Sequence, residues 1–91
     1  MRYSFDQKKR ATNLDKHGLD LADAKLVIES GLTVTFEDRR FDYDEQRYVT
    51  IGPLNDELVV IVTTENDDKV RVISMRKASK DEKAIYRDYL R

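Results

Sequence analysis

Basic side chains, which suit the binding of phosphate, are concentrated at the two ends of this chain. Near the N-terminus, Lys9 and Lys16 are seven residues apart, which is two helical turns, so in a helix both would lie on one face. The only histidine, His17, follows directly. Because an imidazole titrates near neutral pH, His17 is a candidate general base. The alternative is that it interacts only with the negative end of its own helix.

Arginines interrupt two stretches that otherwise have the pattern of strands. Arg71 lies within β-branched residues, where a guanidinium needs a wet cleft or an acidic partner such as Glu45. Arg71 and Arg76 are five residues apart, so on a straight strand they would point to opposite faces. They can converge only if the strand ends or twists near Ser74. Arg47, on a neighbouring predicted strand, could supply a second guanidinium beside Arg71.

Other kinds of catalytic site have little support in the sequence. The chain has no cysteine, which excludes disulfides and thiolate ligands or nucleophiles. It also lacks a glycine-rich phosphate loop and a Ser–His–Asp signature. The acidic residues Asp42, Asp44 and Glu45 lack the spacing and the glycine of a calcium loop, so they predict an exposed acidic loop. We therefore expect neither a metal nor another cofactor.

The length predicts one small domain over residues 1–91, and the order of its predicted helices and strands, given below, makes it α+β. Charged residues make up 38% of the chain, and its longest aliphatic run, Leu58–Val62, is far too short to span a membrane. The N-terminus has no apolar secretory segment, so a cytoplasmic location is the default expectation.

The net charge of −1 conceals a strong segregation along the chain. The balance is +2 over residues 1–20, −8 over residues 21–68 and +5 over residues 69–91. If the two ends meet on one side of the fold, they form a basic surface for phosphate, and the middle forms an acidic surface for a basic partner. The alternative is a solvated surface on which the charges mix.

Two helices, four antiparallel strands and a final helix must position these residues, with the helices on one sheet face. The first of two hairpin strands, 58–64, is apolar on both faces and should be central. Its partner, 69–75, follows a loop of four residues. The remaining predicted strands are a possible short one at 2–6 and two others at 32–36 and 46–52. The predicted helices are 7–17, between Asp6 and Gly18, and 21–30, capped by Asp20. A C-terminal helix begins at the capping box of Ser79 and Glu82.

Several stretches stand in order at the separations found in a known family. These are Phe5-Asp6-Gln7-Lys8-Lys9, Asn13-Leu14, Lys16-His17-Gly18, Arg47…Thr50-Ile51-Gly52 and Arg71-Val72-Ile73-Ser74-Met75-Arg76-Lys77-Ala78. Over residues 3–89 the chain resembles the BrnT family of type II toxins. The usual family pattern is W-D-x-x-K-x-x-x-N-x-x-K-H-G, R-x-x-x-I-G, R-I-I-S-A-R-x-A and a late E-x-x-x-Y. Glu82 and Tyr86 fill the last motif, and Phe5 replaces the tryptophan.

This resemblance implies a RelE-like fold and a metal-independent endoribonuclease that arrests translation. It also implies neutralisation by a BrnA-type antitoxin, with DNA bound only through the complex. Cleavage of RNA through its own 2′-hydroxyl needs a base for that proton, cations at the phosphate and an acid for the leaving oxygen. The predicted site has His17 or Lys9 as the proton carrier, Arg47, Arg71 and Arg76 at the phosphate, and Lys16 and Lys80 on the RNA.

A second hypothesis is a non-catalytic binding module that acts within a DNA-binding, autoregulatory repressor complex. The acidic sequence pI of about 5.8 favours it. So does Asn66, because many members of the family carry an arginine there. The Lys-His-Gly motif and the segment around Arg71 favour the ribonuclease.

Overall fold

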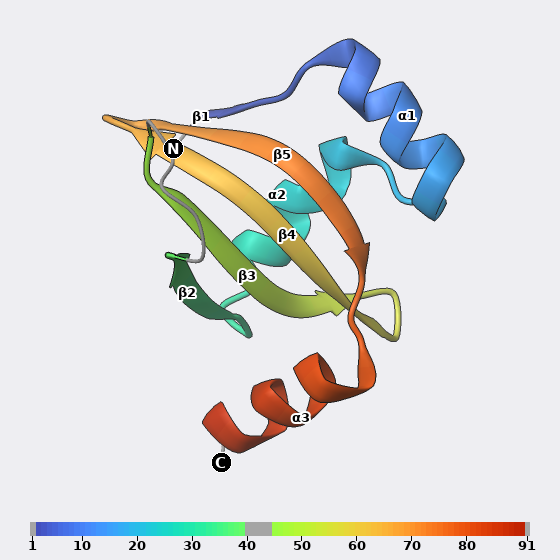
Figure 1. Ribbon diagram of the computed structural model, residues 1–91, viewed down its shortest axis with the longest axis vertical. Coiled ribbons are helices and arrows are strands. Elements are labelled where there is room, and N and C mark those ends of the chain that lie inside the picture. The colour runs from blue at the N-terminus through green and yellow to red at the C-terminus, as the bar shows by residue number, and fades with distance from the viewer. Residues whose placement is uncertain (1, 40–44, 91) are drawn as a thin grey trace.

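The computed structural model describes residues 2–39 and 45–90, and this part of the chain contains three α-helices, one 3₁₀-helix and five strands (Figure 1). The predicted α+β class is confirmed. In chain order the elements are β1 (Arg2–Ser4), α1 (Gln7–His17), the 3₁₀-helix η1 (Leu21–Asp23), α2 (Ala24–Ile28), β2 (Val34–Asp38), β3 (Arg47–Leu54), β4 (Glu57–Asn66), β5 (Lys69–Lys77) and α3 (Lys80–Tyr89).

The strands form one sheet with the order β1-β5-β4-β3-β2. Neighbouring strands are antiparallel, except that β1 runs parallel to β5. β4 is central, as its apolar residues on both faces predicted. The four predicted antiparallel strands are present as β2 to β5, and the possible short strand at 2–6 is present as β1, whose parallel pairing makes the sheet five-stranded and mixed. Three residues are too few to establish a strand by alternation, and this one is fixed by non-local pairing such as Tyr3 opposite Val70.

The β4–β5 hairpin is tighter than predicted. Asn66 pairs with Lys69, so the connection is a two-residue turn of Asp67 and Asp68 and not a loop of four. Asp67 adopts a φ of 53°, a left-handed conformation that aspartate tolerates better than most residues. The exposed polar side chains of Glu65 and Asn66 gave this end of the strand the composition of a loop.

Local capping signals placed the helices well. The Asp6 carboxylate accepts two backbone N–H groups of the first turn of α1, at 2.7 and 3.3 Å, and Gly18 ends the helix with a φ of 69°. Both bonds of the predicted capping box form between Ser79 and Glu82 at the start of α3. The predicted helix over 21–30 is instead a 3₁₀ turn followed by the short α2.

None of the helices in the described residues is long and apolar enough to cross a membrane.

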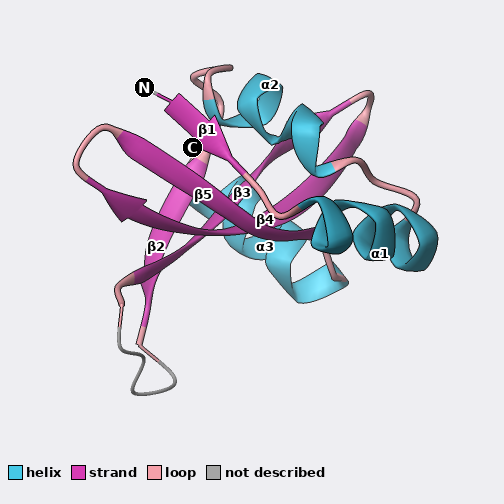
Figure 2. Ribbon diagram, turned by 90° about the horizontal axis from the view of Figure 1, so that it is seen from above, coloured by secondary structure: helices cyan, strands magenta, loops and turns pink. Residues whose placement is uncertain are grey.

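The two faces of the sheet carry different helices (Figure 2). The α2 face holds the main core, under η1 and α2, and α1 lies beside it along the edge of β5. The opposite side, the α3 face, is partly covered by α3. The prediction that the helices pack on one face is therefore wrong, because both faces are apolar and each needs cover. The α2 face buries Leu21, Ala24, Val27, Val59, Ile61, Val72 and Met75, and the α3 face presents Phe36, Val49, Ile51, Val60 and Val62.

Candidate functional site

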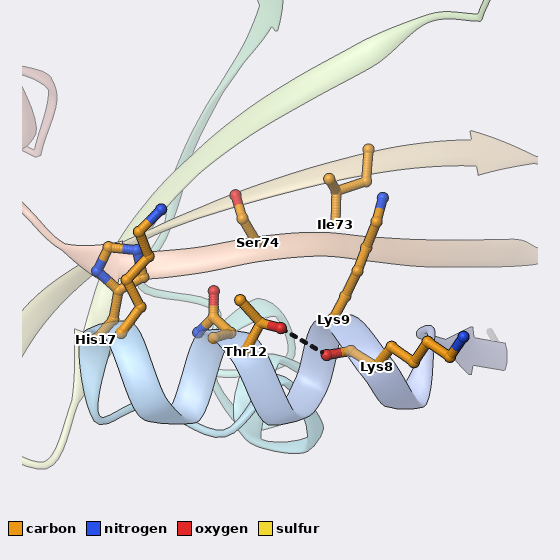
Figure 3. A pocket seen from close by; sticks show the side chains of 8 residues that line it. Lys8, Lys9, Thr12, His17, Ile73 and Ser74 are labelled. Atoms are coloured by element: carbon orange, nitrogen blue, oxygen red, sulfur yellow. Dashed lines mark hydrogen bonds between the residues drawn. The ribbon is translucent and has the colours of Figure 1, made fainter.

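A pocket of about 280 Å³ lies between α1 and the edge of β5 (Figure 3). In this view Lys9 extends from α1 across β5, whereas Lys8 extends away along the helix. We call this cavity the α1–β5 pocket. It brings together three of the predicted site residues, Lys9, Lys16 and His17. Its lining consists of Lys8, Lys9, Thr12, Asn13, Lys16 and His17 from α1, with Ile73 and Ser74 from β5.

Two polar links hold α1 in this position. The buried side chain of Asn13 donates to the carbonyls of Met75 and Leu19, at 2.8 and 2.9 Å, and accepts from the Met75 N–H at 3.1 Å. Arg10 donates to both carboxylate oxygens of Asp20, at 2.8 and 2.9 Å. This guanidinium lowers the pKa of Asp20, so the pair stays charged across the neutral range. The first link joins α1 to the sheet, and the second joins it to the start of η1.

A β-bulge in β5 decides which side chains face this region. Val72 pairs with Thr63 and Ser74 pairs with Val62, so Ile73 is the extra residue. The insertion resets the alternation of side chains along β5. As a result Arg71, Ser74 and Arg76 all lie on the α3 face, although Arg71 and Arg76 are five residues apart. Their partners on β4, two residues apart from one another, are Thr64, Val62 and Val60 respectively. The bulge is the kind of irregularity near Ser74 that Arg71 and Arg76 need in order to share a face.

Arg71 and Arg47 belong to one row across the sheet. Both pair with Thr64, one from each side, and Asp38 pairs with Arg47 at the end of the row. Strands are about 4.8 Å apart, so the two arginine backbones are separated by about 10 Å. Arg47 is half-buried, whereas Arg71 is exposed and makes no ion pair with any residue in the described part of the chain. The alternative in which Glu45 neutralises Arg71 is thus not found.

Arg76 is engaged by the start of α3. Its two terminal nitrogens donate to the two carboxylate oxygens of Glu82, at 2.7 and 2.8 Å. The Arg76 guanidinium is the main reason that the pKa of Glu82 falls to about 2. This bidentate pair links β5 to α3, so Arg76 has a structural partner in addition to its predicted role at phosphate. Lys80 is exposed on the first turn of α3 and does not line the α1–β5 pocket.

Apart from Lys80, which lies on α3, the predicted site residues therefore form two groups, and Ser74 is next to both. One group lies on α1, and the other lies on the α3 face of the sheet. Ser74 lines the α1–β5 pocket and lies on the same face as Arg71. Sequence reasoning missed Ser74 and Asn13 as parts of the site. Only their place within the quoted family motifs could have singled them out, because neither a serine in a strand nor an asparagine in a helix indicates a site.

Metal ligands are not gathered in the part of the chain that the structure describes. No group of three or more His, Cys, Asp or Glu side chains there is arranged to hold a metal ion. The acidic stretch considered from the sequence includes Asp42 and Asp44, which lie outside the described residues. The polar groups that line the α1–β5 pocket are three amines, one imidazole, the Asn13 amide and the hydroxyls of Thr12 and Ser74.

A known protein family matches most of this chain. Residues 5–82 match the family described as "Ribonuclease toxin, BrnT, of type II toxin-antitoxin system". The matched segment begins just before α1 and ends within α3, so it contains the whole α1–β5 pocket and the arginine row. No curated protein matches the chain. The match covers most of the chain, which therefore belongs to the BrnT family of ribonuclease toxins of type II toxin–antitoxin systems.

Proposed function

We propose that this chain is a RelE-like, metal-independent endoribonuclease that arrests translation, and that it cleaves RNA at the α1–β5 pocket and the adjoining Arg71. One observation carries this proposal. The pocket gathers lysines and the only histidine of the chain, while the bulge at Ile73 turns Ser74 and Arg71 to the same side of β5. A phosphate at Ser74 would thus lie between cations from two different elements.

The side chains present suffice for cleavage through the 2′-hydroxyl. His17 takes the proton from that hydroxyl, and the 2′-oxygen attacks phosphorus. Arg71 and the Ser74 hydroxyl stabilise the extra negative charge on the phosphate oxygens. The bond from phosphorus to the 5′-oxygen breaks, and Lys9 gives that oxygen a proton. The products are a 2′,3′-cyclic phosphate and a free 5′-hydroxyl.

The remaining predicted residues have supporting roles in this proposal. Lys16 and Lys80 bind neighbouring phosphates of the RNA strand, where long flexible amines act as point charges. Arg47 adds positive potential behind Arg71. Arg76 contributes to phosphate binding only when Glu82 releases it, since the same two nitrogens donate to that carboxylate.

Membership of a type II toxin–antitoxin family implies an antitoxin partner. We propose a BrnA-type antitoxin that supplies the DNA-binding domain, so that this chain meets DNA only through the complex. A net charge of −1 gives the toxin alone little general attraction to a duplex. Translation, which the proposed toxin arrests, takes place in the cytoplasm, and we place the active toxin there.

Replacement of Arg71 tests the ribonuclease proposal most directly. We expect Arg71→Ala to lower kcat/KM for a single-stranded RNA by at least about 100-fold, because removing one preorganised donor to a developing oxyanion has an effect of this size. The free energy of unfolding should change by less than about 1 kcal/mol, because Arg71 is exposed and has no ion pair to lose within the described chain. Both quantities can be measured on the same purified preparation.

Lys25→Ala provides the matched control, since it removes one exposed positive charge from α2, away from the α1–β5 pocket. It should change cleavage less than about threefold. If both substitutions lowered cleavage equally, Arg71 would contribute only a general electrostatic attraction for RNA. A loss of several kcal/mol of stability in Arg71→Ala would make it a structural residue.

The second candidate function is a non-catalytic module of a repressor complex. The acidic pI and Asn66, which lies exposed at the end of β4 where many members of the family have an arginine, favour it. Induced expression in bacteria separates the two. The ribonuclease arrests growth, Arg71→Ala relieves the arrest, and co-expressed antitoxin does the same. A binding module leaves growth unchanged in every case.

A further inference from the structure

We infer that Asn13 is a positioning residue for RNA cleavage: its side-chain amide holds α1 against β5 and so fixes the width of the α1–β5 pocket. This inference rests on the proposed function, in which that pocket is the site of cleavage. It assigns no contact between Asn13 and the reacting atoms.

The amide of Asn13 uses both of its N–H groups and its oxygen. Both Nδ2 hydrogens have carbonyl acceptors, Met75 at 2.8 Å and Leu19 at 2.9 Å, and Oδ1 accepts the Met75 N–H at 3.1 Å. The residue is only 6% exposed, although asparagine is usually found at the surface. These bonds therefore form in a low-dielectric setting, where losing one partner leaves the others unsatisfied.

Asn13 takes the place of a neighbouring strand. β1 pairs with β5 only as far as Ser4 opposite Arg71, so no strand of the described residues lies beside the edge of β5 beyond Arg71. There the Asn13 amide meets the backbone N–H and C=O of Met75 together, as a paired strand would do. Met75 is completely buried, so its backbone groups need such a partner. The contact also lies two residues beyond the bulge at Ile73.

This link joins the two walls of the pocket at its middle. Asn13 comes four residues after Lys9 and four before His17, so all three lie on the same side of α1. On the other wall, Met75 directly follows Ser74. The distance from the amine and the imidazole to a phosphate at Ser74 therefore depends on the Asn13–Met75 hydrogen bonds. A shift of about 1 Å in such a distance can lower a rate by about 100-fold.

A purely structural role for Asn13 makes a different prediction. In that case its replacement lowers activity only in proportion to the fraction of protein that unfolds. A positioning role lowers the rate of the chemical step in molecules that remain folded. Binding of RNA should change little, because the lysines and Arg71 keep their charges and their places on α1 and β5.

The test uses the full chain, single-turnover cleavage of a single-stranded RNA, and a temperature at which every variant is folded by circular dichroism. We expect Asn13→Ala to lower the cleavage rate constant by about 10- to 100-fold and RNA affinity by less than about twofold. Asn13→Asp should behave in the same way at neutral pH, because a carboxylate cannot donate to the two carbonyls. Gln7→Ala, which removes another amide from α1 outside the pocket, should change neither quantity.

A double variant separates positioning from folding. If Asn13 acts through the pocket, Asn13→Ala should lower the rate constant less in a His17→Ala background than in the wild type, because one of the two groups it positions is already gone. Full additivity would overturn the inference. In amide hydrogen exchange, Asn13→Ala should speed exchange at Met75 at least tenfold while Ile61, on the neighbouring strand, stays protected.

The outcomes for the inference and for the proposed function are distinct. One outcome is that cleavage by the wild type depends on Arg71, while the activity of Asn13→Ala follows only its folded fraction. That outcome overturns the positioning role of Asn13 and leaves the ribonuclease proposal intact. A folded wild type that cleaves no RNA overturns the proposed function, and the positioning role with it.

Discussion

Two helices dock on this sheet by different means. α1 is attached through the buried Asn13, next to a core that the adjoining η1 and α2 build. α3 lies on the opposite face, and none of its residues, all within the described chain, is buried. Its Ile85 and Tyr89 are 40% and 66% exposed. α3 is held by contacts of its side chains with the sheet and with the loop before β2.

The contacts of α3 are few and specific. The Tyr86 hydroxyl donates to the Leu32 carbonyl at 2.6 Å, and the ring of Tyr89 meets Phe36 edge-on, with centroids 5.2 Å apart. The Arg76–Glu82 pair adds a charged link at the solvent boundary. Regions with little buried apolar surface open at lower free energy than core elements. The comparison thus teaches that the core under η1 and α2 should be the part most resistant to opening, while α3 should open more easily.

The largest expected effect concerns the core next to α1. Leu21→Ala should lower the free energy of unfolding by about 3 kcal/mol, because it opens a cavity at a position that is only 1% exposed. Leu26→Ala is the same substitution at a position that is 65% exposed, and it should cost less than about 0.5 kcal/mol. Urea denaturation of both variants measures the difference. Similar losses would show that stability is not concentrated on the α2 face.

A smaller effect is expected from the attachment of α3. Tyr86→Phe removes one hydroxyl that donates to a backbone carbonyl, and it should cost about 1 kcal/mol. Tyr89→Phe keeps the ring contact with Phe36 and removes a hydroxyl for which the described chain offers no hydrogen bond, so it should cost almost nothing. Hydrogen exchange within α3 reports the change directly. Exchange in α1 should be the same in both variants, because each substitution lies on the opposite face of the sheet.

The smallest effect concerns the charge of Glu82. Its pKa falls from 4.5 to about 2 on folding, mainly through Arg76, so the folded state favours the ionised form. The resulting stability is fully present above about pH 4.5 and is lost as the pH falls through about 2. Because the Arg76 side chain is 44% exposed, solvent screening limits this contribution to less than about 1 kcal/mol.

Glu82→Gln isolates that charge, because glutamine can still accept the backbone N–H of Ser79. The difference in unfolding free energy between wild type and variant should be present at pH 6 and vanish near pH 2. Asp88→Asn, which removes an exposed acid from the same helix, should show no such convergence. A difference that stays constant with pH would exclude the ion pair as its source.

The sequence predicted local features better than distant ones. The caps at Asp6, Gly18 and Ser79 and the central place of β4 follow from short-range chemistry and from residues apolar on both faces. β1 was predicted only as a possible short strand at 2–6, and its parallel pairing with β5 was not predicted, because the partner residues are far away in the sequence. The role of Asn13 was also out of reach, since its partner Met75 is 62 residues away. The apolar residues on both faces of β4 imply that helices cover each face of the sheet. The two consecutive helices near the N-terminus suggested instead that helices cover one face alone.

The bulge at Ile73 also decides how β5 responds to a change in its length. Without Ile73, Val72 and Ser74 would be direct neighbours, opposite Thr63 and Val62, which are direct neighbours on β4. A deletion of Ile73 would therefore leave every other residue of β5 with its present partner and on its present face, and Arg71 and Arg76 would still share the α3 face. The bulge thus makes β5 tolerant of losing one residue at this point, and the side chain lost is one that lines the α1–β5 pocket.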